Sequence, residues 1–396
     1  MKHSTFPVTF MPATKPYGQV IAAAGLLSLV STAPIAAQQA SFVYRLGRDT
    51  VAIEQFTRAP NRVTGEMVQR TGAAVALVRY DVALDSEGRP VSASFRRVQA
   101  DGMPFPNNPT EVRLTFTPDS VTREVVRGDS VQRTAYRVSQ AMVAFPVYVY
   151  GPVELLAARR RRGGADSIAA LGMAGNPGFI GLEAAGGDTL RLRGAPYPMR
   201  FVFDAAGLLQ AVDGSMTTNK VMATRGPGGI DLAAIARALR PTGVLSARDV
   251  ARGAFGAGGI VLVDYSRPSV RERTVWGGTL VPVDSIWRAG ANDATHLFTT
   301  RTLTFGALAV PPGTYTLWIQ YTRNGTFLIV NRKIGQWGTE YDASQDVGRI
   351  PMQMTATPAH VEEFMIAVRN LGQNRGALEF AWGDAMWSAA FTATAR

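Results

Sequence analysis

The chain has 396 residues, of which 46% are hydrophobic and 18% charged, and its formal net charge is +11. It contains no cysteine, which excludes disulfides, thiol catalysis, thiolate metal sites and an N-terminal cysteine that could carry a lipid. About two domains of ordinary size fit this length.

The N-terminus has the pattern of a cleavable secretory signal over residues 1–37. Lys2 and Lys15 make it basic, residues 20–30 are mostly apolar, and Ala36-Ala37 ends it with small residues. A basic region, a short apolar core and a small-residue cleavage site are typical of an export signal. A membrane anchor would need about 20 strongly apolar residues. We therefore expect a periplasmic or secreted protein, neither lipid-anchored nor spanning a membrane.

Loss of the two lysines of the signal would lower the net charge from +11 to +9. The remaining cations are nearly all arginines, and in the expected strands they alternate with apolar residues rather than cluster. A basic chain often binds nucleic acid, but we do not expect that partner for an exported protein. Two interpretations stay open: solvated surface cations, or binding to an anionic surface of the cell envelope.

Residues 38–241 are expected to form an antiparallel, curved β-sheet domain. Apolar and charged residues alternate in 188–193, which is typical of a half-buried strand. Residues 121–133 read as a strand, a Gly-Asp-Ser turn and a return strand. The clusters 85–88 and 204–207 each combine Asp and Gly between apolar-alternating runs, which indicates turns.

Two short helices are expected within this domain. Residues 153–162 end in four arginines before Gly163-Gly164, and cations in a last helical turn complement the helix dipole. Residues 231–240 begin at Asp231, a good N-cap, and end before Pro241.

Residues 242–258 are predicted to be a linker, because a glycine-rich passage fills the second half of this segment.

The C-terminal region 259–396 is again β-rich. Asn324-Gly325 separates two apolar runs, which is a strong signal for a hairpin turn. Many short strands with regular turns indicate a β-sandwich of jelly-roll type.

From Val263 to Phe391 the chain resembles an exported bacterial family catalogued as domain of unknown function 2911. The segments that carry the resemblance are Tyr265–Ser269, Trp276–Gly278, Leu280–Pro282, Ile286–Asn292, Ala294-Thr295, Val310–Tyr315, Gly335–Thr339 and Tyr341-Asp342. Pro311-Pro312-Gly313 stands where the family pattern has Pro-Ala-Gly, and His296 stands where a Thr is expected. The resemblance implies an exported β domain and brings no established activity.

Polar residues concentrate in one part of the resembling region, which makes it the candidate ligand site. Arginine and asparagine there could bind a carboxylate or sugar hydroxyls while a tryptophan stacks on a ring. The candidate residues are Arg267, Trp287, Arg288, Asn292, Thr295, His296, Gln336 and Trp337. The alternative is that Arg288 and Asn292 bind buried loop backbone and lock the edge of the sandwich.

Catalytic and metal-binding patterns are weaker. Ser266 and His296 with Asp264, Asp284 or Asp293 could be drawn as a triad, but no Gly-x-Ser-x-Gly motif supports it. Only His296 and His360 follow the predicted signal, and they are far apart in the sequence, so no metal centre is predicted and no cofactor is expected. We expect a non-enzymatic binding or scaffold protein with a small polar or glycan ligand; the alternative is a hydrolase or glycan-active enzyme.

Overall fold

The computed structural model describes residues 37–138, 143–145, 149–155, 167–172, 177–186, 189–192 and 199–394. The secretory signal predicted for residues 1–37 therefore lies outside the described residues, except for Ala37. The described residues are mainly β, as the alternating sequence predicts. No helix of the described residues is long and apolar enough to cross a membrane.

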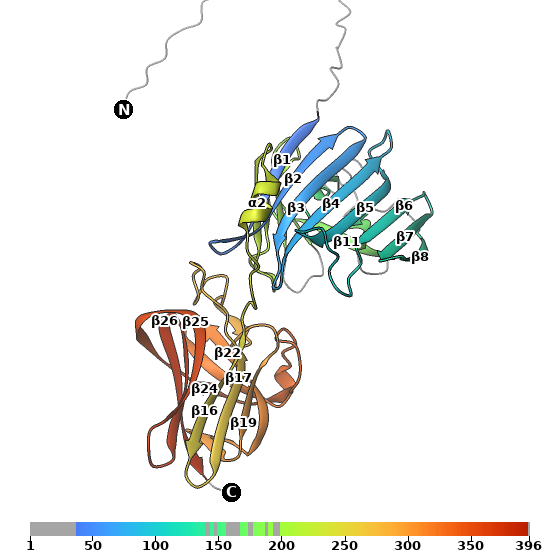
Figure 1. Ribbon diagram of the computed structural model, residues 1–396. Helices are drawn as coiled ribbons and strands as arrows, with labels where there is room; N and C mark the ends of the chain where they lie inside the picture. The colour runs from blue at the N-terminus through green and yellow to red at the C-terminus, as the bar shows by residue number, and fades with distance from the viewer. Residues whose placement is uncertain are drawn as a thin grey trace, which may run out of the picture. The chain divides into compact units, whose positions relative to one another are not determined.

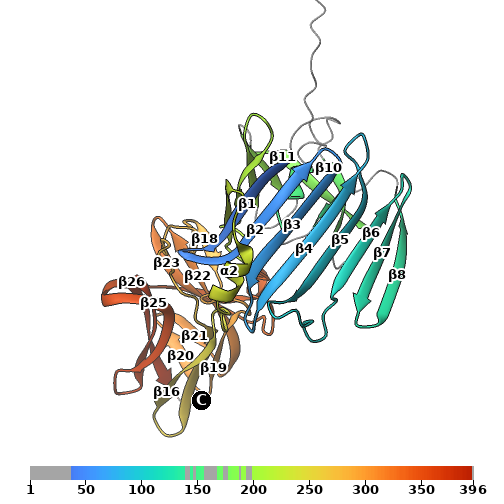
Figure 2. The ribbon, with the colours of Figure 1, turned by 45° about the horizontal axis from the view of Figure 1, so that its top comes forward.

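The first part of the chain forms a large, almost wholly antiparallel sheet that the chain builds in two passes. The first pass runs outward from β1 to β8, and each strand pairs with the next (Figure 2). Its strands are β1 Gln38–Leu46, β2 Asp49–Ala59, β3 Arg62–Arg70, β4 Val75–Leu84, β5 Pro90–Gln99, β6 Glu111–Phe116, β7 Ser120–Arg127 and β8 Ser130–Arg137.

The second pass starts at the opposite edge and returns to the first strand, where β15 pairs with β1. Only β9 and β10 run parallel among these pairs. The strands are β9 Val143–Phe145, β10 Ser167–Gly172, β11 Pro177–Ala184, β12 Thr189–Leu192, β13 Arg200–Phe203, β14 Leu209–Asp213 and β15 Met222–Pro227. The curved antiparallel sheet expected from the sequence is thus confirmed.

Burial alternates along the strands, because successive side chains of a strand point to opposite faces. In β4, Val78, Tyr80, Val82 and Leu84 are buried while their neighbours are more exposed. The buried face of the sheet forms one apolar core, in which Phe42 and Phe56 stack with their ring centroids 5.6 Å apart.

A fully buried carboxylate, Glu54 of β2, ties a non-strand segment into this core. Tyr44 and Tyr80 donate their hydroxyls to it, the second at 2.6 Å, and the backbone N–H groups of Tyr150 and Gly151 donate at 2.8 and 2.9 Å. Burial raises the pKa of Glu54, and the four hydrogen bonds oppose that rise. Space is tight as well, because a Cβ at Gly151 would lie 2.2 Å from the hydroxyl of Tyr80.

A second buried carboxylate, Glu154, holds the same segment. It accepts hydrogen bonds from Arg225 at 2.5 Å, from Arg58 at 3.2 Å and from the backbone N–H of Leu209 at 3.1 Å. Residues 149–155 are all buried, and their apolar side chains belong to the core of the sheet. This segment therefore covers an apolar face that the sheet would otherwise expose.

The two helices expected from the sequence have different outcomes. α2 Leu232–Ala238 begins after Asp231, whose carboxylate accepts a hydrogen bond from Ala234 N as an N-cap does. This helix is confirmed, although it ends before Arg240. Of the helix predicted over 153–162, residues 153–155 are helical, and the four arginines lie outside the described residues.

The C-terminal region is a two-layer β-sandwich, as predicted (Figure 1). One sheet pairs in the order β16-β17-β19-β22-β23-β24 with β18 beside β22, and the other in the order β21-β20-β26-β25. Its elements are β16 Arg248–Phe255, β17 Gly259–Ser266, β18 Ser285–Trp287, β19 Thr295–Thr299, β20 Thr302–Phe305, β21 Leu308–Val310, β22 Gly313–Thr322, β23 Gly325–Asn331, the 3₁₀ turn η1 Ala343–Gln345, β24 Asp346–Pro351, β25 Gln353–Asn370 and β26 Arg375–Thr394.

The structure differs from the sequence-based prediction at the proposed linker. Residues 248–255, which belong to the predicted linker 242–258, form β16 and pair with β17 along their whole length. Glycine in this strand has a packing reason, because a Cβ at Gly253 would lie 2.5 Å from Val368 of β25. Gly256 and Gly258 have positive φ angles and make the turn between the two strands.

We predict that Glu54→Gln lowers the free energy of unfolding by about 1–3 kcal/mol, because an amide NH₂ cannot accept the hydrogen bonds that one carboxylate oxygen receives. Glu66→Gln is the matched control: Glu66 pairs with Arg79 at the surface, and its loss should cost less than about 0.5 kcal/mol. Urea unfolding of the two variants measures both. Equal stability of the two variants would contradict the anchoring role of Glu54.

Candidate functional site

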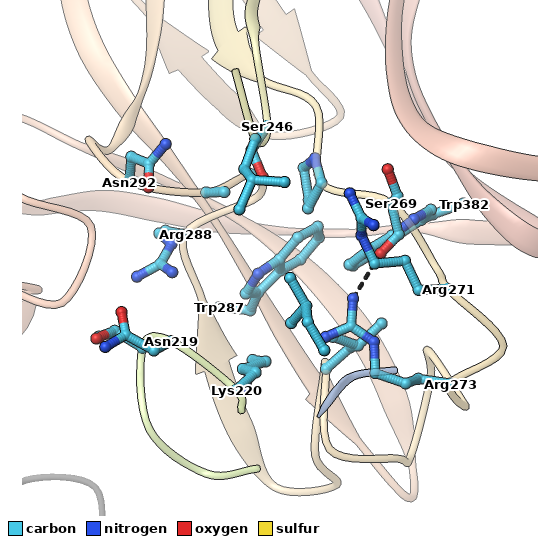
Figure 3. Close-up of a pocket in the computed structure, with 17 residues that line it drawn as sticks. Asn219, Lys220, Ser246, Ser269, Arg271, Arg273, Trp287, Arg288, Asn292 and Trp382 are labelled. Carbon is cyan, nitrogen blue, oxygen red and sulfur yellow. Dashed lines mark hydrogen bonds between the residues drawn. The ribbon is translucent and has the colours of Figure 1, made fainter. Parts of the chain in front are cut away.

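A cavity of about 190 Å³ is the candidate site (Figure 3). It is lined by Leu46, Thr218, Asn219, Lys220, Leu245, Ser246, Pro268, Ser269, Arg271, Arg273, Leu280, Trp287, Arg288, Gly290, Ala291, Asn292 and Trp382. Four of these lining residues are cations and none is Asp or Glu. Arg271 is neutralised by an ion pair with Asp49, and the other three cations leave the described lining with an excess of positive charge.

Arg273 is a half-buried cation whose hydrogen-bond partners are neutral. Its guanidinium donates to the backbone carbonyls of Val270 at 2.9 Å and Ser269 at 2.7 Å. Burial, with a contribution from the nearby Arg271, lowers the pKa of Arg273 to about 10. Glu362 exerts only a weaker opposing influence. The charge is thus held in place without a carboxylate in contact with it.

Lys220, in the loop between β14 and β15, is in the same situation. Its ammonium donates to the carbonyls of Ser215 at 3.1 Å and Thr279 at 2.8 Å. Burial, and then the charges of Arg288 and Arg273, lower the pKa of Lys220 to about 8. Desolvation and nearby positive charges both disfavour the charged form of a lysine, which is why its pKa falls. Arg271 differs, because its guanidinium forms an ion pair with Asp49.

An aromatic cluster forms the floor of the cavity. Strand β18 pairs with β22, so Trp287 lies opposite Ile319. The indole of Trp287 stacks on that of Trp382, with ring centroids 5.3 Å apart and an angle of 16° between the planes. Phe364 packs edge-on against Trp287 at 5.0 Å. In Figure 3 the indole is drawn between Arg288 on one side and Arg273 on the other.

Unfavourable backbone conformations gather at this cavity. Ten described non-glycine residues have positive φ angles, and four of them line it: Lys220 (52°), Ser246 (54°), Arg271 (51°) and Asn292 (59°). Such conformations are uncommon outside glycine and cost free energy, and they concentrate at functional sites. Contacts with the surrounding structure must offset the free energy that these four backbone conformations cost.

Close packing fixes the side chain of Arg288. A Cβ at Gly338 would lie 2.0 Å from Cδ of Arg288 and 2.5 Å from the carbonyl oxygen of Asn292, so this position has no room for a side chain. The backbone N–H of Gly338 donates to that same carbonyl at 2.9 Å. Glycine at 338 thus lets the loop that ends in Asn292 and the arginine pack against each other.

Of the eight residues predicted for the site, the structure brings Trp287, Arg288 and Asn292 to the cavity. Arg267 lies elsewhere and forms ion pairs with Asp249 at 3.5 Å and Glu363 at 2.9 Å.

The other four predicted residues do not line the cavity and have structural contacts. Thr295 is buried and donates to the carbonyl of Ala289 at 2.7 Å, and Gln336 donates to the hydroxyl of Thr316 at 3.2 Å. His296 Nε2 accepts a hydrogen bond from Gly335 N at 3.0 Å. Trp337 is 43% exposed, and its backbone pairs with that of Asp293. These four residues therefore take part in contacts within the sandwich and its loops, whereas the alternative weighed for Arg288 and Asn292 stays open.

The hypothetical triad is not assembled in the described structure. Ser266 is 1% exposed, and its hydroxyl has no hydrogen-bond partner there, whereas His296 is bonded to the loop at Gly335. Among the described residues, no group of three His, Asp or Glu side chains could hold a metal ion.

Sequence reasoning missed Lys220, Arg273, Ser269 and Trp382, which lie far apart in the chain. No local pattern distinguishes Arg273 from the many surface arginines, because what marks it is burial without a carboxylate. The segment Tyr265–Ser269, quoted above for the family resemblance, comes just before it and was the nearest available signal.

Comparison with known proteins agrees with the resemblance. Residues 246–391 match the family described as protein of unknown function DUF2911. No curated protein and no solved structure matches the chain. The matched residues cover the β-sandwich and most of the cavity lining, but not Lys220.

We predict that Gly338→Ala disturbs Arg288 and the Asn292 loop, since the added Cβ meets a backbone oxygen that cannot move freely. Overpacking of this kind costs about 1–3 kcal/mol. Gly306→Ala is the control: Gly306 also lies in this domain and has open space around it, although its positive φ of 57° adds a smaller strain. Thermal unfolding that is equally affected in both variants would contradict the tight packing at Gly338.

Proposed function

We propose that this chain is an exported binding protein whose cavity at Lys220, Arg273 and Arg288 takes a small anionic molecule, and that it acts by binding rather than catalysis. The observation that carries the proposal is the charge of the lining: four cations and no carboxylate among seventeen described residues.

The physical argument starts from the cost of buried charge. A cation removed from water is destabilised unless an opposite charge or a complete set of hydrogen-bond acceptors replaces the solvent. Arg273 and Lys220 have backbone carbonyls only, and their lowered pKa values reflect that deficit. An anion in the cavity would supply the missing counter-charge, and its binding would stabilise the folded protein.

The donor chemistry favours an oxyanion. An arginine can present two parallel N–H groups to a carboxylate or sulfate, and a lysine adds a compact point charge. Asn292 adds a neutral amide to the lining of the same cavity. The backbone strain at Arg271 and Asn292 supports the same conclusion, since strain of this kind is typical of preorganised ligand sites.

The described lining of the cavity lacks the side chains that most often act as the general base in hydrolysis at neutral pH. Its described lining contains no histidine and no carboxylate that could serve as a general base. This supports the binding role over the hydrolase or glycan-active alternative.

To test the binding role, we would titrate the mature protein with sodium sulfate by calorimetry at low ionic strength, because salt screens partly exposed charges. Arg273→Gln should weaken sulfate binding about 10-fold or more, as expected for the loss of a charged hydrogen-bond donor. Arg323→Gln removes the same charge from a side chain that is 82% exposed, and it should bind like the wild type. Undetectable binding, or equal affinity for both variants, would overturn the proposal.

Export is tested separately, by expressing the whole chain in a Gram-negative bacterium. We expect the protein in the periplasm or the medium, with an intact mass that corresponds to cleavage after Ala37, as the small residues there predict. Full-length protein retained in the cytoplasm would contradict export and would leave the binding test unaffected.

A further inference from the structure

We propose that the ligand of this site is an aromatic anion, with its charged group in the cationic cavity and its ring against the apolar side chains of an adjoining cavity. This inference rests on the proposed function and adds the chemical class of the ligand.

A second cavity of about 160 Å³ adjoins the first. Trp287, Arg288, Lys220, Leu280 and Thr218 line both cavities, so a single molecule can reach from one to the other. The charged residues of the shared wall give the junction a positive potential at the point where a ring would join its acidic group.

The second cavity has the chemistry and size for a ring. Met216, Pro282 and Ile286 add apolar surface to that of Leu280 and Trp287, and its described lining again contains no Asp or Glu. An apolar cavity of about 150 Å³ is large enough to take up benzene. A phenyl-sized group therefore matches this space, whereas a free inorganic anion would leave it unused.

The aromatic character of the shared wall favours a planar partner. Trp287 belongs to a packed aromatic cluster, with Trp276 edge-on at 5.9 Å and Trp382 stacked on it. This packing holds the indole rigidly, so it can contact a ring without losing further side-chain freedom. Methionine at 216 adds a polarisable thioether, a group that packs well against aromatic rings.

The experiment compares sodium benzoate with acetate, benzyl alcohol and hexanoate, each titrated into the mature protein. Acetate carries the charge without a ring, benzyl alcohol carries the ring without a charge, and hexanoate carries an acyl chain instead of a ring. We expect benzoate to bind at least about 10-fold more tightly than acetate, because burial of a ring adds apolar contact. Benzyl alcohol and hexanoate should bind more weakly than benzoate.

A pair of variants locates the ring. Thr339 lines only the second cavity, so Thr339→Phe should fill it and abolish the advantage of benzoate over acetate while leaving acetate binding unchanged. Thr392→Phe places the same side chain at an exposed position of β26 and should behave like the wild type.

The outcomes separate the two proposals. If sulfate and acetate bind through Arg273 but benzoate gains nothing over acetate, or Thr339→Phe leaves that gain intact, the aromatic class is overturned and the anion site stands. Equal affinity for hexanoate and benzoate also overturns the aromatic class. If no anion binds at all, the proposed function fails and this inference fails with it.

Discussion

The stack of Trp287 on Trp382 is the contact on which the candidate site depends. It fixes the end of β18 against β26, and the loop that carries Arg288 and Asn292 starts from that point. The same aromatic surface excludes water from one side of the cavity. Arg273 and Lys220 line the same cavity, and burial together with neighbouring positive charges lowers their pKa values.

Buried charge is treated in two different ways within this one chain. In the N-terminal sheet, Glu54 has four donors and Glu154 has donors from two arginines and a backbone N–H. Those carboxylates are satisfied, and their role is to hold residues 149–155 in the core. At the cavity, Arg273 and Lys220 have neutral acceptors only. The two carboxylates thus have charged or numerous donors, whereas the two cations at the cavity have neutral acceptors, and the proposed anion site rests on this contrast.

Much of the fold could be predicted because its signals are local. Alternation along β4, the Asn324-Gly325 turn and the Asp231 cap each depend on a few neighbouring residues. Strand β16 was assigned to a linker because glycine is a poor strand former. The structure shows that Gly253 is needed there for the close approach of Val368, which is distant in sequence.

The site was only partly predictable, for the same reason. Trp287, Arg288 and Asn292 belong to one segment of unusual composition, and the cavity does include them. Thr295, His296 and Gln336 share that composition but serve loop contacts, and composition cannot distinguish a hydroxyl that binds a carbonyl from one that faces a ligand. Arg273 and Lys220 are distant in the sequence, and they become a pair of partly buried cations only when the chain folds. An excess of positive charge over the whole chain attracts anions over long distances, and the proposed site would hold one where folding partly buries Arg273 and Lys220 beside neutral acceptors.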